Sequence, residues 1–390
     1  MKIVSVIAEY NPFHLGHQYQ LEQMKQRTSA DALVVLMSGN VVQRGEFALI
    51  DKWQRAEIAL EYGADLVLEL PLLASLQAAD YFAYWSVKTL ELLGSDQLVF
   101  GTESASYEDL NAYVQWLAEN EKAIDRSVKT NLNEGYSYAA SYQSAVEAIS
   151  KSSEIAQLLV DSPNHLLGIQ YIKALKQLNS KMDVTAIPRI KQNEHMQAVL
   201  SGSQIRELNR QQLVTEDTVP KRTYQKLISH PNVQLTDYYD LLKYQVQSQS
   251  AERLTQYQGI DHGVEHYIYQ QILETDNFDS LIDALTSKRW TKASIQRKLM
   301  MILLNITNKE WQESIELNND LLTIRVLGYS DAGRKVLKMK RSQTRLNLFS
   351  NLTQDNARNY QLNLRADTVY SLNPKHKIMQ QNTGRFPIHY

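Results

Sequence analysis

The chain of 390 residues has no cysteine, which excludes disulfides, cysteine–zinc sites and thiol chemistry and fits a reducing compartment. It also lacks any apolar run approaching the roughly 18 residues of a membrane span. Its short apolar N-terminal run is interrupted by Glu9 and Pro12, too early for a signal peptide. We therefore expect a cytoplasmic protein that is not bound to a membrane.

An excess of charge of one sign is missing as well, because 41 Lys and Arg stand against 43 Asp and Glu, a net charge of −2. Any nucleic-acid surface must then be a local patch. The sequence has no internal repeat and no low-complexity tract. Its length predicts two or three domains with ample chain for a core.

Apolar runs alternate with helical patterns through the first half of the chain. The runs predicted as strands begin at residues 3, 32, 66, 97 and 184. This alternation predicts a parallel sheet with right-handed crossovers. We predict an α/β protein with a Rossmann-like nucleotide-binding domain over 1–220. A mainly α-helical, locally basic domain is predicted over 221–390.

The most informative stretch is the end of the first predicted strand. The run breaks at Asn11-Pro12, and a helical pattern starts at Leu15. His14 and His17 thus fall where a strand passes into a helix, a position at which α/β sheets bind ligands and helix amides favour phosphate. Two imidazoles three positions apart can face one ligand and donate to phosphoryl oxygens as charge develops.

Two other interpretations of these histidines remain open. They could be ordinary residues at a helix start, or they could belong to a metal site, although two histidines alone provide too few ligands. Gly16 between them has no side chain, so a flat group such as adenine could approach the backbone.

Further polar residues lie at predicted strand ends or on the helices that follow. Gly101 closes the fourth strand, and Arg189 ends the fifth, where it could clamp phosphate or carboxylate. Lys52 and Arg55 fall three apart on a helix and could point together at phosphates, or simply form a solvated helical face. Asn164 lies in the first turn of a helix, where it could contact a ligand or act as a cap.

Residues 288–345 hold the one charge bias, with thirteen Lys and Arg against five Asp and Glu. Such a segment attracts a nucleic-acid backbone, and Trp290, Trp311 and Tyr329 within it could stack on unpaired bases. The alternative is a solvated basic face with core aromatics. The predicted RNA-binding residues are Lys292, Arg297, Lys298, Lys335 and Lys338.

The segment His14-Leu15-Gly16-His17 resembles the H-x-G-H signature of the nucleotidyltransferase and class I aminoacyl-tRNA synthetase superfamily. The longer string 9–17 is similar to a narrower family, the bacterial tRNA(Met) cytidine acetate ligases. The pattern 43–46 followed by Lys52 and Arg55 also resembles this family. Residues 201–206 resemble the second superfamily signature, although Ser201-Gly202-Ser203-Gln204 is not the full adenylyltransferase pattern.

The resemblance implies that 1–220 is an ATP-binding catalytic domain, that 221–390 is a tRNA-binding domain, and that the reaction has two steps. ATP, with Mg²⁺ expected beside the triphosphate, would activate acetate as acetyl-adenylate. The acetyl group would then pass to N4 of the wobble cytidine (C34) of elongator tRNA(Met). No obligate protein partner and no dedicated protein metal site are inferred.

The same resemblance, with the chemistry above, gives the predicted site. The predicted catalytic residues are His14, His17, Lys52 and Arg55. The predicted ATP-binding residues are Ile7, Ala8, Glu9, Tyr10, Asn11, Pro12, Phe13, His14, Leu15, Gly16, His17, Gln18, Tyr19, Gln20, Gly101, Asn164, Arg189, Ser203 and Arg206.

Two other functions remain open. A small-molecule adenylyltransferase of the same superfamily is disfavoured by the long chain after the second signature and by its basic segment. A non-catalytic RNA-binding protein that keeps the fold as a scaffold is disfavoured by the intact His14, Gly16 and His17.

Overall fold

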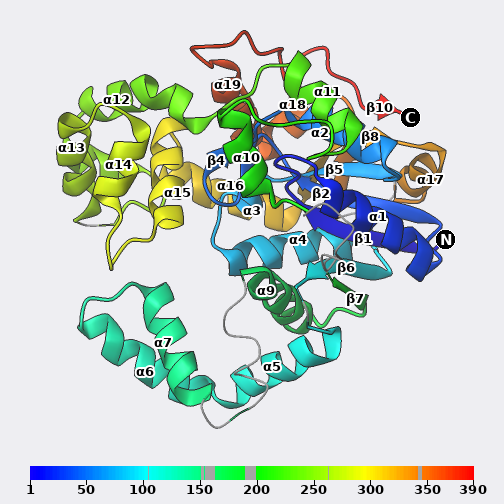
Figure 1. Ribbon diagram of the computed structural model, residues 1–390, viewed down its shortest axis with the longest axis horizontal. Helices are drawn as coiled ribbons and strands as arrows, with labels where there is room; N and C mark the ends of the chain where they lie inside the picture. Colours follow the sequence, from blue (N-terminus) through cyan, green and yellow to red (C-terminus); the bar gives the residue numbers. More distant parts are fainter. Residues whose placement is uncertain (104, 151–152, 154–162, 189–198, 262, 341–344) are drawn as a thin grey trace.

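The computed structural model describes residues 1–390 except 104, 151–152, 154–162, 189–198, 262 and 341–344. The described strands form an eight-stranded sheet in the order β10-β8-β5-β2-β1-β6-β7, with β9 also paired to β8 (Figure 1). These strands are β1 (Ile3–Ala8), β2 (Ala32–Ser38), β5 (Leu66–Leu70), β6 (Gln97–Thr102), β7 (Asp183–Pro188), β8 (Leu322–Tyr329), β9 (Leu346–Phe349) and β10 (Ile388–His389). A separate hairpin pairs β3 (Val41–Val42) with β4 (Glu46–Phe47).

The central strands follow a doubly wound path. From β1 the chain passes outward to β2 and β5 and then returns to β6 and β7 on the other side, with all these pairs parallel. The predicted parallel sheet is therefore confirmed, and its strands begin within one residue of the predicted positions. The change of direction at β1 opens a crevice at the carboxyl ends of β1 and β6, where proteins of this class bind ligands.

Helices cover both faces of this sheet. On one face, Val4 and Val6 of β1 share a core with Leu21 and Met24 of α1 (Leu15–Thr28) and with the buried side of α2 (Lys52–Glu61). On the other face, α4 (Ala79–Leu93) and α9 (Pro163–Gln177) contribute to the second core cluster. All seven residues of β2 are buried, as expected for a parallel strand covered on both sides.

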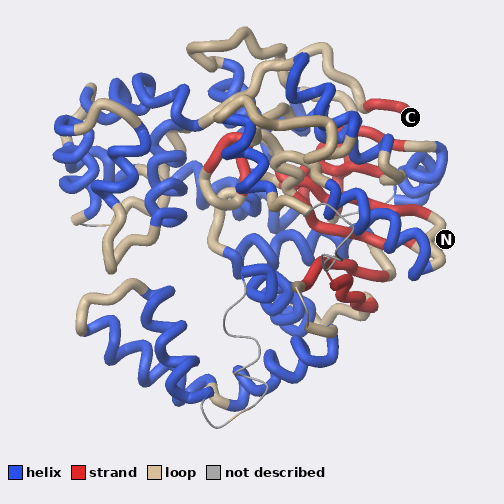
Figure 2. The backbone as a smooth tube through the Cα atoms, in the orientation of Figure 1, coloured by secondary structure: helices blue, strands red, loops and turns tan. Residues whose placement is uncertain are grey.

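Two groups of helices extend away from the sheet, and Figure 2 shows the strands gathered on the opposite side of the molecule. The first group, which we call the lower lobe, consists of α5 (Tyr107–Glu119), α6 (Glu121–Asn133) and α7 (Tyr138–Ser150). The second, the upper lobe, consists of α12 (Tyr239–Gln247), α13 (Val264–Glu274), α14 (Phe278–Leu285) and α15 (Lys292–Leu303). The remaining helices are α3 (Leu72–Ser75), α10 (Gly202–Arg210), α11 (Lys221–Ser229), α16 (Asn308–Asp320), α17 (Asp331–Lys340), α18 (Gln354–Asn359) and α19 (Gln361–Ser371).

The C-terminal third, predicted as a domain over 221–390, also contributes strands to the sheet. Although this segment is mainly helical, its strand β8 pairs antiparallel with β5, so it completes the same sheet that the N-terminal residues begin. The chain therefore leaves the sheet to form the upper lobe and then returns to it. A boundary at residue 220 does not separate two independent sheets or cores.

Candidate active site

His14 and His17 lie face to face at the start of α1. His14 is the N-cap residue, with an extended backbone, and its amide donates to Nδ1 of His17 over 3.2 Å. The two rings are stacked with centroids 3.6 Å apart and planes inclined by 17°. Both residues are half-buried. The pair thus sits at the carboxyl end of β1, beside the first amides of a helix, where negative charge is favoured.

The residues just before the pair support this loop from inside. Tyr10, Asn11 and Phe13 are all buried, and Asn11 Oδ1 accepts a hydrogen bond of 2.9 Å from the amide of Leu49. The Tyr10 ring meets the His17 ring edge-on, with 4.7 Å between centroids. Burial raises the pKa of the Tyr10 hydroxyl. Within the predicted run 7–20, these three residues therefore support the loop, while Ile7, Glu9 and residues 14–20 are partly exposed.

The second predicted motif lies next to the histidine loop. Arg206 of α10 donates through Nη1 to the carbonyl of Asn11 over 2.8 Å, and its Nη2 lies 3.4 Å from Ser203 Oγ and 3.4 Å from Glu46 Oε2. A Cβ added to Gly202 would lie 3.1 Å from the same Asn11 carbonyl, so α10 approaches the loop closely. Arg206 and Asn11, which lie 195 positions apart in the sequence, are thus in direct contact beside the histidine pair.

Gly101 at the end of β6 forms the other side of the crevice. Among the described residues, a Cβ at this position would meet nothing nearer than Gln20 Nε2, at 3.9 Å, so the backbone is open to a ligand there. The structure therefore brings Gln20 and Gly101 together. Arg189 and the side chain of Asn164, at the start of α9, lie outside the described residues.

Glu9 connects the end of β1 to the β3–β4 hairpin. Its carboxylate accepts a hydrogen bond of 2.8 Å from the amide of Gln43, and burial, with Glu46 nearby, raises its pKa. At the tip of the hairpin Gly45 has φ +79°, and a Cβ there would lie 2.5 Å from the backbone nitrogen of Arg297. The hairpin is thus held between the histidine loop and α15 of the upper lobe.

Lys52 is placed differently from the predicted phosphate-facing position. Its side chain is fully buried, and Nζ donates to Glu69 over 2.8 Å, to Asp367 over 2.6 Å and to Tyr360 over 3.0 Å. Burial raises the pKa of both carboxyl groups, and the charge of Lys52 lowers both. The net effect is a lowered pKa for Glu69 and a raised pKa for Asp367. Lys52 therefore joins α2 to β5 and α19. No local pattern in the sequence predicts the contact with Asp367, because this residue lies 315 positions from Lys52.

Arg55 is also buried and does not point outward with Lys52. Its Nη1 donates to the carbonyls of Glu9 (2.6 Å) and Ser38 (3.0 Å), and Nε donates to that of Ile50 (3.0 Å). Nη2 donates to the carbonyl of Gly39. Burial lowers the pKa of this guanidinium. Arg55 thus fastens together the carboxyl ends of β1 and β2, which makes it a support of the crevice in this structure.

The predicted RNA-binding residues differ in accessibility. Lys298 is buried and bonds to the carbonyl of Gly259 and, over 3.0 Å, to Asp261, so it does not face solvent as predicted. Trp311 is a core residue and cannot stack on a base as predicted. Arg297 is half-buried. The residues that do face solvent are Lys292, Lys335 and Lys338.

These exposed lysines do not form one patch. Lys292 begins α15 in the upper lobe, whereas Lys335 and Lys338 lie on α17, which packs near β2, β5 and β8. Figure 1 shows α15 and α17 on opposite sides of the molecule. The single basic surface predicted over 288–345 is therefore two separate surfaces.

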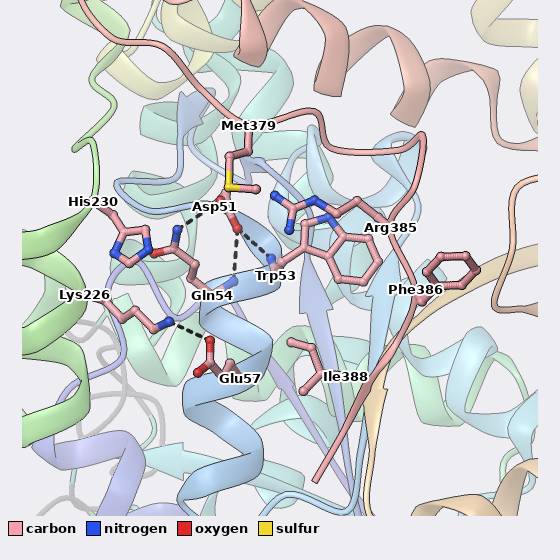
Figure 3. A pocket seen from close by; sticks show the side chains of 10 residues that line it. All are labelled: Asp51, Trp53, Gln54, Glu57, Lys226, His230, Met379, Arg385, Phe386 and Ile388. Carbon is pink, nitrogen blue, oxygen red and sulfur yellow. Dashed lines mark hydrogen bonds and ion pairs between the residues drawn. The ribbon is translucent and has the colours of Figure 1, made fainter.

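A cavity of about 220 Å³ lies where the C-terminal segment crosses α2 and α11 (Figure 3). Within it Lys226 Nζ lies 2.6 Å from a carboxylate oxygen of Glu57, and Trp53 Nε1 donates to the carbonyl of Gln381. Its lining residues are Asp51, Trp53, Gln54, Glu57, Lys226, His230, Met379, Arg385, Phe386 and Ile388. None of these belongs to the predicted nucleotide site.

Among the described residues, no helix has both the length and the apolar character needed to cross a bilayer. Over the same ranges, no three His, Asp or Glu side chains converge as potential metal ligands.

Comparison with known proteins agrees with the geometry of this crevice. Residues 1–385 match the family model described as HIGH Nucleotidyl Transferase. The tRNA(Met) cytidine acetate ligase of Streptococcus equi subsp. zooepidemicus is 36% identical over 395 residues, covering 100% of this chain and 98% of that protein. The enzyme of the same name from Leuconostoc citreum is 34% identical over 404 residues, with coverage of 100% and 98%.

Solved structures show the same fold. The crystal structure of Thermotoga maritima TmcAL bound with alpha-thio ATP superposes with a TM-score of 0.86 at 26% identity, covering 100% of this chain and 99% of that chain. Its apo form gives a TM-score of 0.87 with the same identity and coverage. The matches extend over the sheet, both lobes and the C-terminal third. The chain therefore belongs to the HIGH nucleotidyltransferase family, among the tRNA(Met) cytidine acetate ligases.

Proposed function

We propose that this protein is an ATP-dependent ligase that acetylates a cytidine in tRNA. Acetate attacks the α-phosphorus of ATP, giving acetyl-adenylate and pyrophosphate. N4 of the wobble cytidine (C34) of elongator tRNA(Met) then attacks the acetyl carbonyl, giving N4-acetylcytidine and AMP. Because the substrate is tRNA, we also propose that the reaction takes place in the cytoplasm.

The observation that carries this proposal is the stacked pair His14 and His17 at the carboxyl end of β1. Family membership supports it, as do the name shared by the curated relatives and the alpha-thio ATP in the Thermotoga maritima structure. The open backbone at Gly101 lies at the switch point between β1 and β6, where proteins of this class bind nucleotides.

The first step needs donors around a phosphorus that gains negative charge. His14 and His17, with the first amides of α1, would donate to the phosphoryl oxygens. Arg206, fixed to the loop through the Asn11 carbonyl, would stabilise the outer phosphates, with Ser203 beside it. Arg55 would act indirectly, by keeping the ends of β1 and β2 in place.

The second step needs no protein nucleophile, because an acyl adenylate is already activated towards an amine. It does need protection of the mixed anhydride from water, which the docked RNA would provide. Mg²⁺ is proposed to accompany the triphosphate, bound mainly through its oxygens and water, as is usual for this ion.

We would test the function with labelled acetate, ATP and total bacterial tRNA, followed by nucleoside analysis. Label in N4-acetylcytidine that disappears without ATP is the expected result. Replacing His17 by Ala should lower acetate-dependent ATP–pyrophosphate exchange at least about 100-fold, because one of two donors to the developing charge is lost. His376→Ala, which changes an exposed histidine outside the crevice, serves as the matched control.

Exchange at the wild-type rate in the His17 variant would contradict the assignment of this residue. An adenylylated small molecule formed without RNA, and no label in tRNA, would instead indicate the adenylyltransferase function.

A further inference from the structure

The two helical lobes are in contact with each other. In the turn between α6 and α7, the amide of Ser137 donates to the carbonyl of Lys288 in the loop before α15, over 2.8 Å. The Lys288 ammonium lies 5.6 Å from the centre of the Tyr136 ring. Figure 1 shows the loop that precedes α15 extending towards the turn between α6 and α7. This contact joins segments about 150 residues apart.

Aromatic rings lie on both sides of this contact. Tyr136 and Tyr138 are 41% and 64% exposed, and Tyr138 stacks on Tyr142 with centroids 6.1 Å apart. On the upper lobe, the half-buried Trp290 stacks on Tyr267 with centroids 5.9 Å apart. We call these five residues the aromatic strip. Within the strip, Tyr142, Tyr267 and Trp290 pack against the core, whereas the rings of Tyr136 and Tyr138 are exposed. Large exposed rings are costly to leave in water, so these two indicate a surface that binds something.

Cations accompany the strip. Lys173 lies 5.7 Å from the Tyr142 ring centre, and Arg289 lies 5.0 Å from that of Trp290. Carboxylates are close too, since Asp80 and Asp125 help to raise the pKa of Tyr138 after the effect of its partial burial. The local charge is therefore mixed. Attraction between this surface and RNA phosphates therefore cannot dominate binding, whereas stacking of bases on the aromatic rings can.

The strip is connected to the β3–β4 hairpin through α15. Trp290 precedes α15 by two residues, and the backbone of α15 at Gln296 and Arg297 packs against Gly45 of the hairpin that contacts the histidine loop. From Lys292 to Arg297 the helix rises about 7.5 Å.

We propose that the aromatic strip binds unpaired nucleotides of the RNA substrate on one side of the base that is acetylated. The proposal rests on the function proposed above and adds the surface that holds the loop of the tRNA. Unpaired bases are the part of an RNA that aromatic side chains can stack on, whereas a duplex hides its base faces. The single-stranded loop is therefore the occupant that fits rings with little net charge around them.

The test is the substitution Tyr138→Ala, with Tyr138→Phe as the variant that keeps the ring. Tyr244→Ala is the matched control, because Tyr244 is 71% exposed on α12 and belongs to no part of the strip. Affinity for in vitro transcribed elongator tRNA(Met) is measured by filter binding at several salt concentrations. Acetate-dependent ATP–pyrophosphate exchange without RNA is measured on the same samples.

Losing one stacked base should weaken tRNA binding about 5- to 150-fold in Tyr138→Ala. Tyr138→Phe and Tyr244→Ala should bind like the wild type. The slope of log Kd against log salt should stay the same, because no phosphate contact is removed. Exchange should be unaffected in all variants.

Unchanged tRNA affinity in Tyr138→Ala would overturn the proposal, and so would equal weakening in Tyr138→Phe or Tyr244→Ala. A flatter salt slope in Tyr138→Ala would also overturn it, because the contact would then be to phosphates. Failure of the proposed function looks different, since wild-type protein would lack acetate-dependent exchange while its RNA affinity could still be measured.

Discussion

At the scale of single residues, burial separates the predicted catalytic residues into two kinds. His14 and His17 are half-buried at a helix start, whereas Lys52 and Arg55 are fully buried. A spacing of three places two side chains on one side of a helix, but it does not tell whether that side meets solvent or core. Here that side meets the core, because α19 returns from the far end of the chain to cover Lys52.

Replacing Lys52 by Met should destabilise the protein rather than selectively abolish catalysis. Glu69 and Asp367 would keep buried carboxylates without their shared cation. We expect the free energy of unfolding to fall by about 3–5 kcal/mol, measured by urea denaturation. Lys309→Met is the control, because the Lys309 side chain is 85% exposed and its ion pair with Glu313 is long, at 3.8 Å. Losing this ion pair should lower the free energy of unfolding by about 0.5 kcal/mol or less. A stable Lys52 variant without ATP–pyrophosphate exchange would restore a catalytic role.

At the scale of elements, the β3–β4 hairpin couples the upper lobe to the histidine loop. It contacts the loop through Glu9 and Arg206, and it contacts α15 through Gly45. The hairpin also contributes Val41 and Phe47 to the core. Its two strands have two residues each and were not predicted from the sequence.

Gly45→Ala should disturb this junction more than an ordinary glycine substitution would. The new methyl group would lie 2.5 Å from the Arg297 nitrogen, and the residue has φ +79°. Gly259→Ala is the matched control, because Gly259 has φ +76° but no atom of the described residues within 4 Å of the added Cβ. We expect a loss of about 1 kcal/mol for the control and 2–4 kcal/mol for Gly45→Ala, measured by urea unfolding. Equal losses of stability in the two variants would show that α15 moves enough to accommodate the added methyl group.

The sequence predicted elements with strong local patterns well. The strands of the parallel sheet begin within one residue of their predicted starts. The place of β8 next to β5 was missed, because pairing between residues some 250 positions apart has no local pattern. The split of the basic segment was missed for the same reason, since α15 and α17 are neighbours in sequence but not in space.

At the scale of the whole molecule, ion pairs fasten the late helices to one another. Arg365 of α19 donates to Glu310 of α16 over 2.6 Å. Burial works against the charge of Glu310, but Arg365 and Thr307 outweigh it and lower its pKa to about 2. A carboxylate with a depressed pKa in the folded state stabilises the fold above its unfolded-state value, and this contribution is lost as pH falls towards the folded-state value.

Glu310→Gln should therefore be less stable than wild type at pH 6, and the difference should shrink between pH 4.5 and pH 2. Urea unfolding midpoints at pH 6, 4 and 3 measure it. Glu313→Gln, which removes only an exposed contact to Lys309, should differ little from wild type at every pH. A Glu310 variant with the same deficit at pH 6 and pH 3 would contradict this account.

The antiparallel pairing of β8 with β5 also has a consequence for synthesis on the ribosome. The outer edge of β5 leaves the ribosome about 250 residues before the strand that covers it. At about 5–20 residues per second, this edge of five mostly apolar residues stays unpaired for roughly 13–50 s. A nascent chain with such an edge can pair with its neighbours on a polysome. The protein should consequently depend on chaperone protection late in translation, and fragments that end before residue 322 should aggregate rather than fold as a free nucleotide-binding half.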